Sequence, residues 1–261
     1  MKYIELQSRP YPEKVGGTCG TIEPNLTEDA IFYEDGIPVG FYIKNLSTYS
    51  EKASSYAELA DRELRSPRVP KSEMRRSSGL HDATFDVRQY SVILGGVPPK
   101  PHMRRNYPTV SSVHSVGSAA NFIKAMLLLC RESENIIKEI MPEQYEFQKL
   151  AIQQNAPPEY RFGELFTSSI SNFNIAANYH TDNANLRGCV NVIIAKRKSS
   201  TGGNTTIPEY GVTVDSCDNS MLVYPAWKSL HGVTPIIPLA EGGYRNSLVF
   251  YPLKSFAKYV S

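Results

Sequence analysis

Apolar residues recur at helical spacing in three stretches of the first 160 residues. The spacing predicts helices over residues 50–64 and 118–140, because an apolar stripe with a period near 3.6 residues can face a core. Pro142 stops or kinks the second helix, and a shorter helix over 142–153 continues the pair. The residues that define the longer stripe are Ala120, Ile123, Leu127, Cys130, Ile136, Ile137 and Ile140.

Between the N-terminus and the first helix, two β-prone stretches at 30–33 and 39–43 flank the dipeptide Asp35-Gly36. Asp-Gly is a hairpin signal because both residues tolerate positive φ, so we expect an antiparallel hairpin here. The later stretch 65–108 is rich in proline, glycine, serine and arginine. This composition predicts a long functional loop or lid rather than packed core.

After Phe162 the pattern changes to short β-prone stretches separated by turns. Many short strands of this kind indicate a sandwich, a jelly roll or a barrel. We therefore predict an α+β protein with one domain, 1–261, in which a helical and loop layer (1–160) packs on a double-sheet core (161–261). The predicted strands are 169–176, 189–195, 205–207, 211–214, 221–224, 232–236 and 247–250.

Composition narrows the class of protein. Hydrophobic residues make up 41% of the chain and charged residues 21%, which is ordinary for a soluble globular protein, and no apolar run is long enough to span a bilayer. The first ten residues lack the apolar segment of a secretory signal. The cysteines form no CxxC pair, so we expect free thiols and a reducing compartment such as cytoplasm or nucleus. We further expect no membrane partner, because no apolar run could span a bilayer, and we favour a monomer. The cysteines are Cys19, Cys130, Cys189 and Cys217.

Charge is unevenly distributed. The net charge of +2 says little about partners, but residues 62–105 hold ten basic side chains and four acidic ones. Such a segment fits a polyanionic partner, and a solvated surface loop is an equally weighted alternative. The candidate contacts to a polyanion are Arg75, Arg76, Arg104 and Arg105.

One triplet carries candidate metal chemistry. In His180-Thr181-Asp182 the first and third residues point to the same side of an extended segment, so an imidazole and a carboxylate can meet one ion. His231 opens a later β-prone stretch. Two histidines and one carboxylate leave three octahedral positions open, which suits a non-haem iron(II) oxygenase. A catalytic zinc ion or a purely structural polar cluster are the alternatives.

Fourteen residues after His231, Arg245 and Ser247 lie on the same side of a predicted strand. A guanidinium within a β-core can clamp a carboxylate through two hydrogen bonds, and the Ser247 hydroxyl can add a donor. Zinc hydrolysis would not require this pair, so the combination favours an oxygenase with a carboxylate co-substrate.

The region 166–252 resembles the 2-oxoglutarate/iron(II)-dependent dioxygenases. Within them it is most similar to the TET/JBP-type nucleic-acid base oxygenases of fungi and bacteriophages. For a phage protein the compartment would be the host cytoplasm. The segments that carry the resemblance are Phe166–Asn174, His180–Asp182, Gly202–Val212, Asn219–Pro225, Leu230–Pro235 and Tyr244–Tyr251.

The resemblance implies roles for these residues. His180, Asp182 and His231 would be the iron(II) ligands. Arg245, with Ser247, would bind the far carboxylate of 2-oxoglutarate while its keto-acid end chelates the iron. O₂ would be the second co-substrate and ascorbate a possible reductant, and decarboxylation to succinate and CO₂ would drive hydroxylation of a substrate C–H bond.

The resemblance also implies a double-stranded β-helix (jelly-roll) core with the N-terminal helices packed on one sheet. Asn172 and Asn174 precede the His180 triplet on an expected neighbouring strand, where the family often places polar groups near the co-substrate.

The implied substrate is the methyl group of a 5-methylpyrimidine, 5-methylcytosine or thymine, in DNA. The base would be flipped out of the duplex, and the basic segment 62–105 would hold the backbone. The alternatives are a dioxygenase of a small molecule, free nucleotide or protein side chain, and a non-catalytic binding module. Residues that could contact the base or phosphate, or simply pack, are Phe85, Tyr90, Tyr107, His81, His102 and His114.

Overall fold

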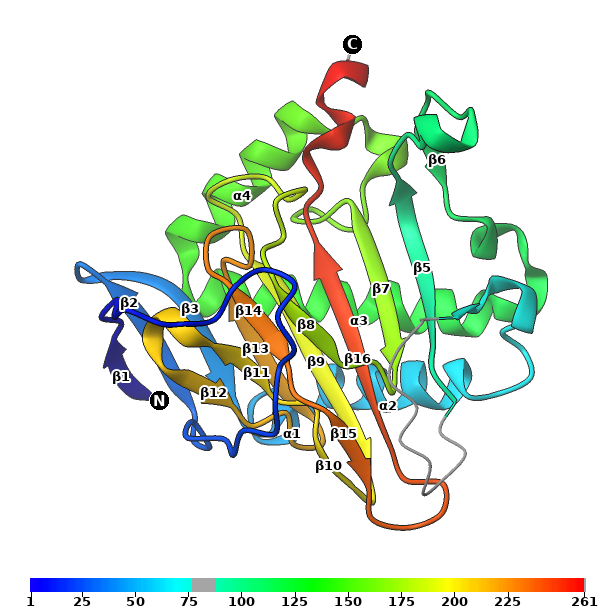
Figure 1. Ribbon diagram of the computed structural model, residues 1–261. Coiled ribbons are helices and arrows are strands. Elements are labelled where there is room, and N and C mark those ends of the chain that lie inside the picture. Colours follow the sequence, from blue (N-terminus) through cyan, green and yellow to red (C-terminus); the bar gives the residue numbers. More distant parts are fainter. Residues whose placement is uncertain (77–87, 261) are drawn as a thin grey trace.

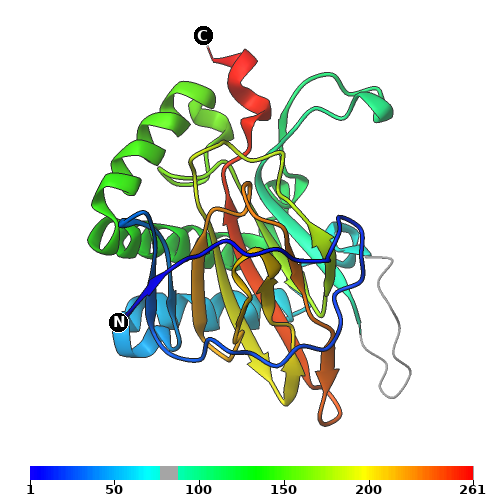
Figure 2. The same cartoon turned by 60° about the vertical axis from the view of Figure 1, so that its left-hand side comes forward.

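The computed structural model describes residues 1–76 and 88–260, and for Arg75 and Arg76 it describes the backbone alone. A small sheet lies in front of a large one, and helices cover the outer face of the large sheet (Figures 1 and 2). The α+β jelly-roll architecture with helices packed on one sheet is thus confirmed.

The large sheet has ten strands among the described residues, and β16 and β9 lie at its centre. In spatial order the strands are Lys2–Glu5 (β1), Ala30–Glu34 (β2), Ile37–Ile43 (β3), Ser220–Tyr224 (β13), Asn191–Lys198 (β9), Tyr244–Tyr251 (β16), Ser168–Phe173 (β7), Tyr90–Val97 (β5) and Arg75–Arg76 (β4), with Thr109–Val110 (β6) beside β5. Apart from β1, which runs parallel to β2, neighbouring strands are antiparallel.

The small sheet faces the inner side of the large one. Its strands are Val212–Val214 (β12), Thr205–Ile207 (β11), His231–Val233 (β14) and Ala177–His180 (β8). A separate ribbon pairs Ser200–Gly202 (β10) with Ile236–Pro238 (β15). Both sheets contribute side chains to one internal cavity, which places the candidate site between the two layers.

The helices form the outer layer. Ser50 begins α2, because its hydroxyl accepts a hydrogen bond from the backbone N–H of Ala53 at 3.2 Å. Buried alanines, Ala53, Ala57 and Ala60, share one core with the apolar face of α3 and the outer face of the large sheet. Their small side chains let the helices approach closely. The helices are Leu46–Tyr49 (α1), Glu51–Leu64 (α2), Ala120–Ile140 (α3) and Pro142–Asn155 (α4).

The expectation of a loop over 65–108 is wrong for β5 (Tyr90–Val97), which pairs with β7 inside the large sheet. The glycines that suggested a loop are there because side chains would not fit. A Cβ at Gly95 would lie 2.7 Å from a backbone oxygen, and one at Gly96 would lie 2.7 Å from the ring of Phe256. Close packing, rather than a loose chain, explains this composition.

Other expectations hold. Residues Asp35 and Gly36, with φ of 51° and 75°, turn the chain between β2 and β3, as the hairpin signal predicted. The four cysteines are free thiols, as predicted. None of the helices in the described part of the chain is long and apolar enough to cross a membrane.

A buried carboxyl group joins α3 to the loop before β7. The Glu134 Oε1 atom accepts hydrogen bonds from the backbone N–H groups of Glu164 at 2.7 Å and Leu165 at 2.9 Å. A Cβ at Gly163 would lie 2.3 Å from this oxygen, so the loop needs glycine there. Burial raises the pKa of Glu134 from 4.5 to about 7, although the two N–H donors act in the opposite direction.

This raised pKa predicts a pH-dependent stability. The folded protein holds the Glu134 proton above the unfolded-state pKa, so its contribution is complete below about pH 4.5 and is lost as the pH rises through about 7. The loss is on the order of 3 kcal/mol, at roughly 1.4 kcal/mol per pKa unit. Glu134→Gln keeps an acceptor and removes the titration. In urea unfolding, the variant should gain stability relative to wild type between pH 5 and pH 8. An unchanged difference between the two pH values would contradict this assignment.

Candidate metal centre

The two candidate histidines lie directly opposite each other on neighbouring strands of the small sheet. His180 ends β8, His231 begins β14, and the two are partners in the strand register. Their ring centroids are 4.3 Å apart. Both side chains line a cavity of about 310 Å³ between the sheets, at the lower end of the range for ligand pockets, about 300 to 1,000 Å³.

Each imidazole is oriented by the backbone carbonyl of the residue two positions earlier in the chain. The Nδ1 atom of His180 lies 2.7 Å from the carbonyl oxygen of Asn178, and Nδ1 of His231 lies 3.0 Å from that of Ser229. Because a carbonyl can only accept, Nδ1 carries the proton in both rings and Nε2 keeps its lone pair. Burial, followed by the neighbouring His180, lowers the pKa of His231. The neutral form of His231 is the one that can bind a metal.

The Asp182 carboxylate completes the cluster. Its Oδ1 lies 3.6 Å from Nε2 of His180 and 4.0 Å from Nε2 of His231. The other oxygen, Oδ2, accepts hydrogen bonds from Nδ2 of Asn191 at 2.9 Å and of Asn185 at 3.5 Å. One carboxylate oxygen is therefore held by the protein, and the other faces the two imidazoles.

The donor set fits one metal ion. The ligand atoms of the three residues lie within 4.8 Å of one another, and two imidazoles with one carboxylate are the facial set of non-haem iron(II) sites. The exposure of the side chains is asymmetric: 4% for His231, 32% for Asp182 and 42% for His180. The open side of the cluster is therefore the side of His180.

A buried guanidinium lies further along the cavity. Arg245 is on β16 and only 2% exposed, yet no carboxylate of the described residues pairs with it. Its Nη2 lies 3.5 Å from the hydroxyl of Ser216, and its Nε has no hydrogen-bond partner among the described atoms. Burial, and to a lesser extent the neighbouring Arg197, lower the pKa of Arg245 to about 9. A buried unpaired cation of this kind favours an anionic ligand.

The cavity wall beside this guanidinium is polar and shaped for a small molecule. Ser247 follows Arg245 on the same face of β16, and Thr205 adds a buried hydroxyl without a partner among the described residues. At Gly203 a Cβ would lie 3.1 Å from the Arg245 side chain, so a glycine leaves room for it. Arg245, Ser247 and the three residues of the metal cluster therefore line the same cavity.

The structure separates the two candidate asparagines. Asn172 lines the cavity and is the register partner of Ser247. Asn174 does not line it: its Oδ1 accepts a hydrogen bond from the backbone N–H of Arg245 at 2.9 Å, and its own backbone N–H donates to the Arg245 carbonyl at 2.8 Å. The expected place of Asn174 beside the co-substrate is corrected to a clamp on the Arg245 backbone.

Two residues of the cluster were missed from the sequence. Asn191 is 3% exposed and donates a hydrogen bond to Asp182. Asn185 donates hydrogen bonds to Asp182 and to the side-chain oxygen of Asn191. The available signal was an asparagine directly before the apolar run Val192–Ala195, a position where burial demands a polar partner. Nothing in the sequence indicates that this partner is Asp182.

Among the side chains that the structure describes in the basic segment 62–105, which exclude those of Arg75 and Arg76, several arginines are held within the fold. Arg65 forms an ion pair with Asp61, and Arg68 forms one with Glu63. Arg105 donates to the Thr109 hydroxyl and the Pro98 carbonyl, so it holds its own turn, whereas Arg104 is exposed at φ 57°.

The other candidate contacts differ in their placement. Tyr90 is buried and stacks on Phe173, so it packs rather than contacts a ligand. Tyr107 is 60% exposed. The ring of His114 accepts a hydrogen bond from the backbone N–H of Gly95, and His102 is exposed. His81 and Phe85 lie outside the described residues.

Fold and site together define a class of enzyme. A jelly roll that presents two histidines and one carboxylate toward a buried, unpaired arginine is the arrangement of the oxygenases that use iron(II) and 2-oxoglutarate.

Comparison with known proteins gives the family. The Tet_JBP sequence model, which describes the oxygenase domain of the 2OGFeDO superfamily, matches residues 100–254. The chain therefore belongs to this family, and it is a 2-oxoglutarate- and iron(II)-dependent dioxygenase. A search of curated proteins finds no match.

One of the solved structures that match shares the fold. NgTET1, in complex with 5mC DNA, matches with a TM-score of 0.56 at 12% identity, over 93% of this chain and 84% of that chain. A 2OG-Fe(II) oxygenase family protein from Caulobacter crescentus matches with a TM-score of 0.44 at 10% identity, over 78% and 73% of the two chains.

The cluster geometry predicts that removal of one imidazole abolishes metal binding. In His231→Ala only two ligands remain, and both are partly exposed to water. Calorimetric titration with iron(II) under anaerobic conditions should show no specific site, and turnover should be lost. His102→Ala, which removes an exposed histidine outside the cavity, is the matched control and should bind iron(II) like wild type. Wild-type affinity in the His231 variant would be incompatible with the assignment.

Proposed function

We propose that this dioxygenase hydroxylates the methyl group of a 5-methylpyrimidine, 5-methylcytosine or thymine, in DNA. The observation that carries the proposal is a combination: the sequence matches the Tet_JBP oxygenase domain, and the structure holds a complete candidate metal cluster and an unpaired buried arginine in one cavity. The likeness of nearly the whole chain to NgTET1, which was solved with 5mC DNA, supports DNA as the substrate class.

Different residues of the cavity would bind the metal ion and the co-substrate. His180, Asp182 and His231 would hold iron(II), and Arg245 with Ser247 would bind the far carboxylate of 2-oxoglutarate. When bound, iron(II) and 2-oxoglutarate would activate O₂: one oxygen atom would enter succinate as 2-oxoglutarate is oxidised and loses CO₂, and the other would be inserted into a substrate C–H bond. The chain provides the orientation: a buried cation fixes one end of the co-substrate and excludes water from it.

The exposure of the cluster indicates how a substrate approaches. His180 and Asp182 are its open side, so a methyl group has to arrive from there. The cluster lies between two sheets, which a base stacked in a duplex cannot enter. The base would therefore be flipped out of the duplex before reaction.

A protruding loop at the same end of the molecule offers a contact to the DNA backbone. The residues at this end are linked by register, because Gly95 pairs with Ser168 and Ser168 with Tyr251. Leu253, two residues after Tyr251, forms an isolated β-bridge with Asn185, which donates a hydrogen bond to the metal-cluster residue Asp182. The loop that follows β5 is therefore at the cluster end of the sheet. It exposes Arg104, and Met103 and Tyr107 are 65% and 60% exposed.

Product analysis tests the substrate directly. The enzyme, supplied with iron(II), 2-oxoglutarate and ascorbate, is incubated with DNA that contains 5-methylcytosine and thymine, and the nucleosides are analysed by mass spectrometry. A 5-hydroxymethyl product of either base is expected, with an equivalent amount of succinate and none from His231→Ala. Free nucleotides serve as a second substrate set. A product from nucleotides alone, or from neither set, would refute the proposal for DNA.

DNA binding through the exposed loop predicts a specific salt dependence. Each phosphate contact contributes about −0.9 to the slope of log affinity against log salt. Arg104→Ala should lower binding and reduce this slope by about one. Lys124→Ala, which removes an exposed positive charge from the helix layer, should leave both values unchanged. Equal effects of the two variants would show that the loop is not the contact.

A further inference from the structure

One buried carboxylate holds strand β16 on both sides of Arg245. Asp61, on α2, accepts a hydrogen bond on Oδ2 from the Tyr244 hydroxyl at 2.7 Å and one on Oδ1 from Nδ2 of Asn246 at 3.1 Å. Successive side chains of a strand point to opposite faces, so these two residues face the helix layer while Arg245 and Ser247 face the cavity. The helix therefore grips the residue before the arginine and the residue after it.

Asp61 is fully buried, and its negative charge is balanced locally. Arg65, the residue directly after the end of α2, donates to Oδ2 from Nε at 3.0 Å and from Nη2 at 2.9 Å. The Arg65 guanidinium also lies 4.7 Å from the centre of the Tyr244 ring. The Tyr244 ring also stacks on the ring of Phe173, with the two ring centres 5.2 Å apart. Both oxygens of Asp61 are thus committed, and a buried carboxylate in this state has little freedom to move.

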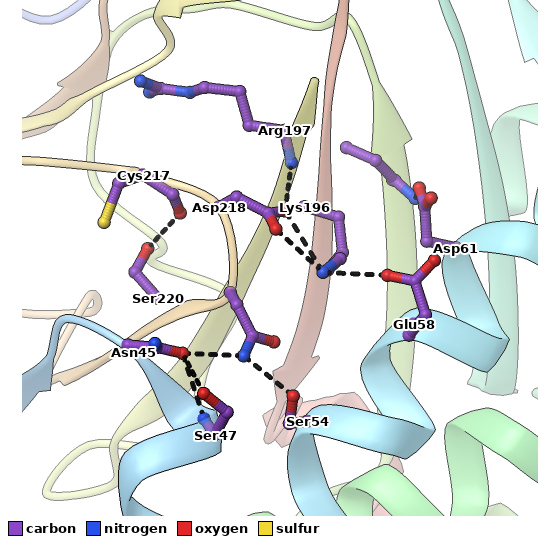
Figure 3. Close-up of polar contacts among 12 residues, drawn as sticks. Asn45, Ser47, Ser54, Glu58, Asp61, Lys196, Arg197, Cys217, Asp218 and Ser220 are labelled. Atoms are coloured by element: carbon purple, nitrogen blue, oxygen red, sulfur yellow. Dashed lines mark hydrogen bonds and ion pairs between the residues drawn. The ribbon is translucent and has the colours of Figure 1, made fainter. Parts of the chain in front are cut away.

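A second polar contact of the same helix fixes the neighbouring strand. Figure 3 shows Lys196 of β9 between Glu58 of α2 and Asp218, with N–O distances of 3.1 Å to each carboxylate. Lys196 is the register partner of Asn246 across β9 and β16. The helix therefore holds two adjacent strands at the level of Arg245, and Asp61 supplies the contact to β16 itself.

Position matters for Arg245 because its guanidinium has few other anchors. Its side chain has one long hydrogen bond, to Ser216, and Asn174 holds only its backbone. A shift of β16 by a fraction of an ångström would move a donor that has to meet a carboxylate with fixed geometry. Misplacement on the order of 1 Å can cost about 100-fold in a site of this kind.

We propose that Asp61 is a positioning residue for Arg245, and that it sets the affinity for 2-oxoglutarate from the opposite face of the large sheet. The inference rests on the proposed role of Arg245 in binding the far carboxylate of this co-substrate. Asp61 does not touch the cavity: it acts through Tyr244 and Asn246, whose hydrogen bonds fix the twist and height of β16.

The test compares two buried acids of α2. Asp61→Asn removes the charge and one acceptor at nearly constant shape. Glu63→Gln makes the same chemical change at a carboxylate that pairs with Arg68 and does not contact β16. Binding of 2-oxoglutarate to manganese(II)-loaded protein is measured by calorimetry, together with manganese(II) affinity, urea unfolding, and KM and kcat.

In Asp61→Asn the dissociation constant and KM for 2-oxoglutarate should rise about tenfold, as is typical when an outer-shell partner is lost. The manganese(II) affinity and kcat at saturating co-substrate should change less than about twofold. Glu63→Gln should lower stability without changing 2-oxoglutarate binding. Unchanged 2-oxoglutarate binding in the Asp61 variant, or an equal change in both variants, would overturn the inference.

Two further variants keep the result interpretable. Arg245→Ala tests the role of the arginine by itself: wild-type 2-oxoglutarate binding in that variant would refute the proposed site, whereas weak binding there with no effect at Asp61 would refute only the positioning role. If Asp61→Asn does not fold, Tyr244→Phe removes one of the two hydrogen bonds and retains the ring. It should weaken 2-oxoglutarate binding about threefold, which is about half the free-energy change of a tenfold loss. No change would overturn the inference.

Discussion

The burial of the Arg245 guanidinium without a counterion is the constraint around which this protein is organised. Removing a charge from water is costly, and here no carboxylate of the described residues offsets that cost. A central strand, β16, carries the arginine, Asn174 clamps its backbone, and glycine at 203 leaves space for its side chain. The fold thus maintains an unfavourable charge, and an anionic co-substrate bound there as proposed would relieve it and stabilise the protein.

Much of the site follows from local sequence, and the reason is the period of a β-strand. The i and i+2 relation is sufficient to group His180 with Asp182 and Arg245 with Ser247, and all four side chains line the cavity. The prediction of a loop over 65–108 was wrong for β5 because glycine occurs both in turns and where two segments pack closely. Only the packing around Gly96 shows that the second case applies here. The predicted position of Asn174 differs from the structure because β7 ends at Phe173. The positive φ of Asn174 interrupts the strand pattern in which alternate side chains face the cavity.

Long-range partners could not be obtained in this way. Asp61 and Tyr244 are separated by 183 residues, and α2 on its own shows only an amphipathic helix with acids and arginines. The same holds for β5, whose register partners on β7 lie 73 to 83 residues later, from the pair Gly95 and Ser168 to the pair Tyr90 and Phe173. The region that the family model matches begins at residue 100, so the strands β1, β2 and β3 and the helix α2 lie outside it, although they belong to the same sheet and its helical cover.

The two halves of the site differ in how far their geometry depends on the rest of the chain. Each imidazole is oriented by the backbone carbonyl of the residue two positions earlier, so this part of the geometry depends only on the local chain. The arginine is aimed by groups on a distant helix and a neighbouring strand. If Arg245 binds the co-substrate as proposed, substitutions in the helix layer would alter its affinity for the co-substrate and leave the orientation of the two imidazoles unchanged. Relatives that share the histidine strands but differ in the helix layer are where altered co-substrate use should first arise.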